Sequence, residues 1–150
     1  MTIAVGVAIV AVGLFAGASL YVSVVEHPAW VECGPALAVK HFGPSARRAG
    51  VMQGGLAMVS LLAAVVAWTQ HAAVGWLVGG LLVATMIPFT FGVIMPVNRR
   101  LLDASLDTGS AEAVELVRRW GRLHAVRTAV GVVVFVLFVI LALRSLVNGA

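Results

Sequence analysis

Ionisable side chains stand where long uncharged stretches of this sequence begin and end. Residues 1–25 carry no charge, and Glu26 and His27 follow directly. Near the start of the last apolar stretch, Trp120, His124 and Arg127 are spaced i, i+4 and i+7, so they share one face of a helix. Ionisable groups at membrane depth are costly and usually functional. These residues are therefore the first candidates for a site.

Two amides and a proline extend this group. Pro28 disfavours helical backbone at His27, so we expect the first helix to end there, at the membrane surface. Asn98 is expected at the same level on the third helix, and Gln53 about one turn inside the second. We expect His27, Asn98 and His124 to surround one cavity at that level. The alternative is a hydrogen-bonded cluster that only fixes the register of the helices.

The composition identifies the elements that must position these side chains. The chain is 61% hydrophobic and 11% charged, with a mean hydropathy of +1.06, whereas soluble domains carry about 25% charged residues. We predict one integral membrane domain over residues 1–150, an all-α, up-down-up-down bundle of four transmembrane helices. The expected spans are about 3–26, 49–68, 73–96 and 123–145. Ser110 is expected to cap a last helix that begins outside the membrane.

The basic residues predict the orientation. Every Lys and Arg except Arg144 lies in or beside the first and third loops. Cytoplasmic loops are enriched in Lys and Arg, so we expect this face in the cytoplasm of a multi-pass inner-membrane protein, with both termini outside the cytoplasm. The basic residues flank apolar segments, so their expected partner is membrane lipid and not nucleic acid. The single cysteine, Cys33, excludes an internal disulfide.

Small residues recur four apart within the spans, a spacing that lets two helix backbones approach closely. We therefore expect helix packing at three glycine pairs: Gly13 and Gly17, Gly50 and Gly54, and Gly75 and Gly79.

Several motifs together resemble the anthrone-oxygenase-like family of small four-helix membrane proteins, much of it described only as a domain of unknown function. The motifs are "EHPAW", "CGPALAVKHFGPSARRAGVMQGGLA", "MPVNRRL" and "RRWGRLHAVRTA". The resemblance extends from Gly13 to about Leu143. It implies a four-helix bundle that oxidises an anthrone to an anthraquinone with O2 as co-substrate. It also implies that the substrate is a small amphipathic aromatic, phenolic or quinone-like, that enters from the lipid.

The resemblance suggests a cofactor-independent oxygenase. A C–H next to a carbonyl of an anthrone is acidic enough for a histidine to remove its proton, and the enolate can pass an electron to oxygen. A neutral imidazole suits the base and a guanidinium suits the oxyanion. Under this interpretation His124 or His27 is the base and Arg127 is the oxyanion partner.

The remaining candidates would bind or orient the substrate. Asn98 and Gln53 would orient it by hydrogen bonds, and Trp120 would offer a flat aromatic wall. Glu26 would orient one histidine or pair with Arg127.

Two other classes of function stay open. His27, His124 and Glu26 could ligate a transition metal or a haem in a redox protein, although two histidines and one acid are a small ligand set and no HxxxH, ExxH or CxxCH pattern is present. The chain could instead be a non-enzymatic accessory or carrier protein of the membrane. The sequence leaves open whether the protein forms a homo-oligomer.

Overall fold

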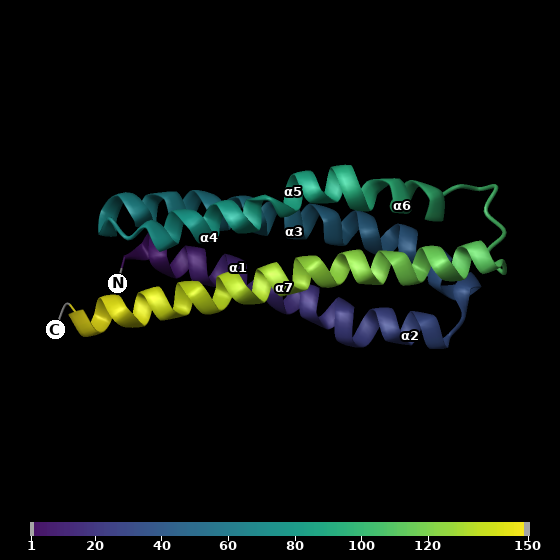
Figure 1. The fold of residues 1–150 in the computed structure, drawn as a ribbon, viewed down its shortest axis with the longest axis horizontal. Coiled ribbons are helices and arrows are strands. Elements are labelled where there is room, and N and C mark those ends of the chain that lie inside the picture. Colours follow the sequence, from purple (N-terminus) through teal and green to yellow (C-terminus); the bar gives the residue numbers. More distant parts are fainter. Residues whose placement is uncertain (1, 149–150) are drawn as a thin grey trace.

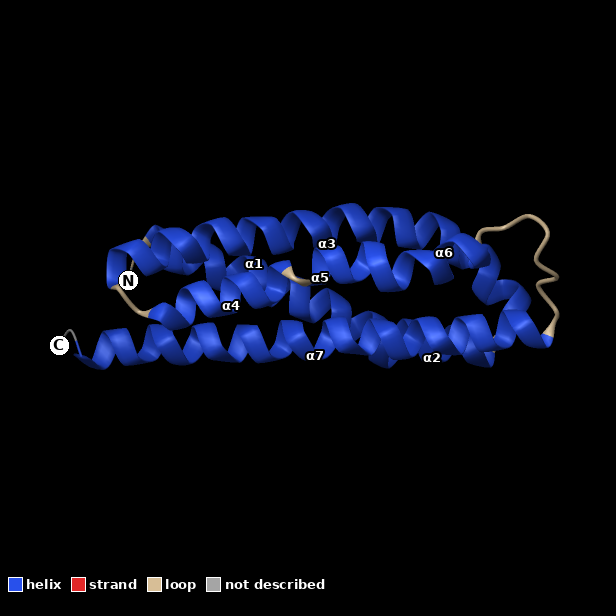
Figure 2. Ribbon diagram, turned by 45° about the horizontal axis from the view of Figure 1, so that its top comes forward, coloured by secondary structure: helices blue, strands red, loops and turns tan. Residues whose placement is uncertain are grey.

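A computed structural model describes residues 2–148, and this part of the chain folds into four helical rods connected by short loops, without strands (Figures 1 and 2). The rods are Ile3–Glu32, Pro35–His71, Val74–Leu101 and Ala111–Val147, each long and apolar enough to cross a membrane. The prediction of an all-α four-helix bundle is confirmed. Residues 1, 149 and 150 of the expected domain lie outside the described part.

The first rod continues beyond Pro28, where we expected it to end. It consists of α1 (Ile3–Tyr21), a π-helical turn η1 (Val22–Glu26) and α2 (His27–Glu32). In η1 the backbone N–H of His27 donates to the carbonyl of Val22, five residues back. The α-helix thus starts anew after η1, and Pro28 lies in its first turn, where a missing N–H costs little.

The second rod is one helix, α3 (Pro35–His71), and the third is assembled from shorter pieces. These are α4 (Val74–Ala84), α5 (Met86–Phe89), a second π-helical turn η2 (Thr90–Ile94) and α6 (Met95–Leu101). Pro96 stands in the first turn of α6, two residues after η2, as Pro28 stands two residues after η1. Both π-helical turns therefore restart an α-helix at a proline.

The fourth rod, α7 (Ala111–Asn148), runs along the whole bundle (Figure 1). It begins as expected at Ser110, whose Oγ accepts a hydrogen bond of 3.2 Å from the N–H of Ala113. The first turn of α1 and the last turn of α7 lie at the same end of the bundle as the α3–α4 connection, and the α6–α7 loop lies at the other end (Figure 1).

Two apolar cores hold the rods together. One contains Phe15, Trp76 and Phe138, and the other contains Trp30 and Trp120. Every rod contributes to both cores. Between its two core segments each rod carries polar residues: Ser19 and Ser23 on the first, Gln53 on the second, Thr90 on the third, and His124, Arg127 and Thr128 on the fourth. The cores thus enclose a polar level near the middle of the bundle.

The glycines divide into two groups. A Cβ added to Gly13 would meet Phe135 at 3.1 Å and one added to Gly75 would meet Leu141 at 2.8 Å, so these positions allow close packing as expected. A Cβ on Gly17 would meet nothing within 4 Å, so the expected close packing is absent there, and the same is true of Gly50 and Gly54. The expectation that Gly50 and Gly54 pack two helices together is wrong, because these two glycines border a cavity.

Candidate functional site

The polar layer of the bundle consists of seven residues from all four rods: Ser19, Ser23, Gln53, Thr90, His124, Arg127 and Thr128. Ser19 takes part through its backbone carbonyl, and its buried Oγ has no hydrogen-bond partner among the described residues. Five of the seven residues are buried: Ser19, Gln53, His124, Arg127 and Thr128. Buried polar groups require hydrogen-bond partners, so the contacts within this layer decide what it can do.

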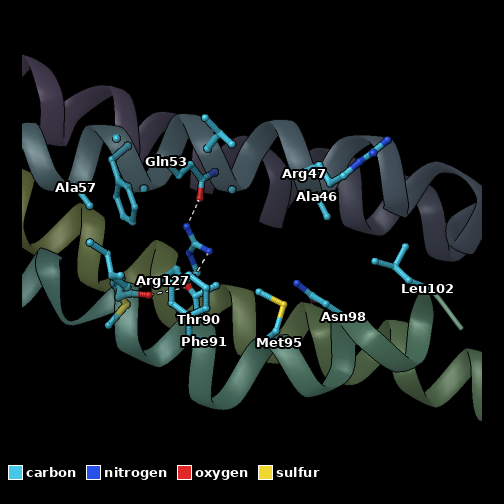
Figure 3. Close-up of a pocket in the computed structure, with 17 residues that line it drawn as sticks. Ala46, Arg47, Gln53, Ala57, Thr90, Phe91, Met95, Asn98, Leu102 and Arg127 are labelled. Atoms are coloured by element: carbon cyan, nitrogen blue, oxygen red, sulfur yellow. Dashed lines mark hydrogen bonds between the residues drawn. The ribbon is translucent and has the colours of Figure 1, made fainter.

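Arg127 forms the centre of the layer and is only 8% exposed. Its Nη2 donates to Gln53 Oε1 at 2.6 Å, and its Nη1 donates to Thr90 Oγ1 at 3.1 Å (Figure 3). The guanidinium carbon lies 5.7 Å from the centre of the Phe15 ring. All three neighbours are neutral, and no ion pair within residues 2–148 includes Arg127. Arg127 is therefore a buried cation without a counter-ion.

Some of the hydrogen-bonding groups around Arg127 are unpaired. Arg127 Nε, Gln53 Nε2 and Asn98 Oδ1 are buried, and each lacks a hydrogen-bond partner in the part of the chain that the structure describes. Two of these are donors and one is an acceptor. Leaving such groups unpaired costs about 1–3 kcal/mol each, so they mark a place for a polar ligand.

His124 is 4% exposed and stacks on Trp120, with ring centroids 4.8 Å apart and ring planes at 26°. Its Nδ1 lies 3.1 Å from Ser23 Oγ, and Ser23 Oγ lies 2.7 Å from Thr128 Oγ1. The imidazole is thus held on one face by an aromatic ring and at one nitrogen by a hydroxyl.

The two π-helical turns supply the hydroxyls that contact these two side chains. Ser23 belongs to η1 and reaches His124, and Thr90 belongs to η2 and reaches Arg127. The sequence analysis missed both residues, and it also missed Thr128. For Ser23 and Thr90 a signal was present, because each hydroxyl interrupts an apolar span a few residues before a proline, Pro28 or Pro96.

Two neighbouring cavities, which share part of their lining, adjoin the layer. The outer cavity, of about 550 Å³, has apolar walls that include Phe15 and Met86, with Gln53, Asn98 and Arg127 as polar groups (Figure 3). The inner cavity, of about 100 Å³, is lined by aromatic side chains and by His124. Gln53, Thr90, Asn98 and Arg127 line both cavities, so a ligand at this junction reaches these four side chains of the site.

The outer cavity opens on the lipid-facing side of the bundle. Val51 and Phe91 line it and are 81% and 67% exposed. Both are apolar residues within rods that are long and apolar enough to cross a membrane, so a bilayer around these rods would place acyl chains at this opening. The absent side chains of Gly50, Gly54 and Gly55 leave the space beside them open.

His27 is separate from these cavities. Its Nε2 donates to the backbone carbonyl of Val117 at 2.9 Å, and its ring packs directly against Gly121. His27 is not among the residues that line the outer or the inner cavity, contrary to the expectation that it shares one cavity with Asn98 and His124. In this position it fastens the first rod to the fourth.

Glu26 does not contact Arg127. Its carboxylate accepts hydrogen bonds from the Tyr21 hydroxyl at 3.1 Å and from Trp30 Nε1 at 3.0 Å. Within residues 2–148, no group of three or more His, Cys, Asp or Glu side chains could hold a metal ion. Trp120, expected as a wall for the substrate, lines the inner cavity and supports the ring of His124.

Comparison with known families gives one match. A family model described as anthrone oxygenase matches residues 42–137. The matched region includes Gln53, Asn98, Trp120, His124 and Arg127, and it begins after the rod that carries Ser23 and His27. Comparisons with curated proteins and with solved structures give no match.

Proposed function

The chain belongs to the anthrone oxygenase family, and from this premise we propose that it oxidises an amphipathic phenolic aromatic with O2 in the outer cavity. The proposed catalysts are the chain's own side chains, with His124 as base and Arg127 as oxyanion partner. Gln53 and Asn98 orient the substrate at the junction of the two cavities.

The burial of Arg127 without a counter-ion carries this proposal. A buried guanidinium that has only neutral neighbours is under-compensated, and it is aimed at an apolar cavity large enough for a small fused aromatic. An enolate oxygen would supply the missing negative charge and accept from Arg127 Nε or Gln53 Nε2. The layer is thus built for a ligand that becomes more negative during reaction.

The proposed reaction converts the CH2 group of an anthrone, which lies across the central ring from the ketone and is conjugated with it through the aromatic rings, into a second carbonyl. His124 removes one proton, and Arg127 and Gln53 hold the resulting enolate oxygen. The enolate transfers an electron to O2, and recombination forms a carbon–oxygen bond. The proton on His124 then passes to the peroxide oxygen, and the hydroperoxide loses water to give the ketone. The balance is CH2 + O2 → C=O + H2O.

The orientation follows the distribution of charge. We propose that the end of the bundle with the α2–α3 and α6–α7 connections lies in the cytoplasm, because the basic residues other than Arg127 and Arg144 lie toward that end. The substrate then enters the outer cavity from the bilayer, between this end and the bilayer centre.

The test is oxygen consumption by the purified protein with an anthrone as substrate, in parallel with product absorbance. We expect one O2 consumed per quinone, and with ¹⁸O2 one labelled atom in the new carbonyl. His124→Ala should lower kcat by about 10²–10⁴-fold while the protein still purifies folded. Saturable binding of the anthrone without oxygen consumption would replace this proposal with a carrier function. Full activity of His124→Ala would remove His124 from the mechanism.

A further inference from the structure

We infer that Ser23 and Thr128 are positioning residues that hold His124 in the Nδ1–H tautomer, so that its Nε2 lone pair faces the inner cavity. The importance of this tautomer for turnover rests on the proposed function. The tautomer itself follows from the hydrogen bonds alone.

The hydrogen bonds link His124 to Ser23 and Ser23 to Thr128, and Thr128 determines which group donates in each of them. Thr128 Oγ1 lies 3.0 Å from the carbonyl oxygen of Ser19 and 3.4 Å from that of His124. A carbonyl oxygen can only accept, so either contact uses the single hydroxyl proton of Thr128. The direction of the remaining bonds does not depend on which carbonyl receives it.

The donors of the two remaining hydrogen bonds follow because each hydroxyl has only one proton. Since the Thr128 proton is used, the 2.7 Å contact with Ser23 requires Ser23 to donate and Thr128 to accept. The Ser23 proton is then used as well, so at 3.1 Å the Ser23 oxygen accepts from His124 Nδ1–H. A neutral imidazole carries one N–H, and Nε2 is left as the acceptor.

The surroundings keep this arrangement in place. Ser19, His124 and Thr128 are buried, so water does not compete for their hydrogen bonds. The stacked ring of Trp120 fixes the plane of the imidazole, and the π-helical turn η1 brings Ser23 to Nδ1. No hydrogen bond from the described residues reaches Nε2, and His124 lines the inner cavity.

Neither hydroxyl touches the cavities. Ser23 and Thr128 are absent from the walls of both the outer and the inner cavity, so their removal should leave substrate binding intact. In a Ser-His-Asp triad, losing the group that sets the histidine tautomer lowers kcat by about 10⁴-fold. By the same reasoning, loss of a positioning hydroxyl should lower kcat, whereas loss of a binding group should raise KM.

The experiment compares Thr128→Val, which removes the hydroxyl at nearly constant shape, with Thr128→Ser, which keeps it. The readout is the ¹⁵N spectrum of histidine-labelled protein in lipid, in which protonated and unprotonated ring nitrogens resonate far apart. The His124 signals are assigned by their loss in His124→Gln. Ser60→Ala is the matched control, because Ser60 is equally buried and its hydroxyl bonds a carbonyl elsewhere, that of Ala8 at 3.4 Å.

We expect wild type, Thr128→Ser and Ser60→Ala to show Nδ1–H with unprotonated Nε2. In Thr128→Val the Ser23 proton loses its acceptor and turns to Nδ1, so the tautomer should change to Nε2–H and kcat should fall at least tenfold with KM unchanged. An Nε2–H tautomer in the wild type, or no change in Thr128→Val, overturns the inference. If the tautomer changes as expected and turnover does not, the inference stands and the role of His124 as base fails.

Discussion

Arg127 illustrates the conflict between stability and function at a single residue. Lysine at this position keeps the charge but cannot reach Gln53 and Thr90 at once, because it lacks the planar fork. We expect Arg127→Lys to retain partial activity. Arg127→Met should lose about 10²–10³-fold in kcat, the usual effect of removing an oxyanion donor.

The same methionine variant should be as stable as the wild type or more stable. It removes a desolvated cation that no acid compensates, and such replacements are often neutral or stabilising. Thermal unfolding in detergent measures this, and oxygen uptake measures the activity. A large drop in unfolding temperature would show that Arg127 serves the fold.

His27 should behave in the opposite way. His27→Ala loses the hydrogen bond to the Val117 carbonyl and the packing against Gly121, with no change at either cavity. We expect a loss of about 1 kcal/mol in stability and a kcat within a few-fold of wild type. Thermal unfolding and turnover are measured on the same preparation. A loss of turnover as great as that of His124→Ala, in folded protein, would return His27 to the site.

At the scale of the helices, the glycine face of α3 defines the outer cavity. Gly54→Leu places a side chain into open space in its wall, so it should fill the cavity without a clash. We expect KM for the aromatic substrate to rise at least tenfold with unchanged thermal stability. Gly17→Leu on α1 is the matched control, since its Cβ also meets nothing and Gly17 does not line the cavity. Equal effects of the two variants would contradict the assignment of Gly54 to the cavity wall.

The helices also explain which side chains could be placed from sequence. On α7, which is uninterrupted, Trp120, His124 and Arg127 share a face as the helical spacing predicts. On the first rod, η1 inserts a wider turn and rotates the residues after it by about 100° relative to a regular helix. His27 and Glu26 were therefore expected on the cavity side and lie elsewhere. Hydropathy predicts the rods, but it does not indicate the π-helical turns.

For the whole molecule, the orientation in the membrane gives a test by chemical labelling. In a Cys33→Ser background, a single cysteine replaces exposed Gln70 near the α3–α4 connection or exposed Ala104 in the α6–α7 loop. We expect an impermeant maleimide to label position 70 in intact cells and position 104 only after the membrane is opened. The reverse pattern would invert the proposed orientation, and total labelling in opened cells controls for expression.

The lipid-facing mouth at Val51 and Phe91 has a kinetic consequence. A substrate that enters through this mouth comes from the bilayer and not from the buffer. Saturation of the protein then depends on the mole fraction of substrate in the bilayer and not on its concentration in the buffer. In proteoliposomes at fixed protein and substrate, added empty lipid should dilute the substrate and raise the apparent KM in proportion to total lipid. Expressed as a mole fraction, KM should stay constant. An apparent KM that does not change with the added lipid would mean that the substrate comes from the aqueous phase. Exposed Arg47, one turn before Val51 on α3, would then mark the entrance.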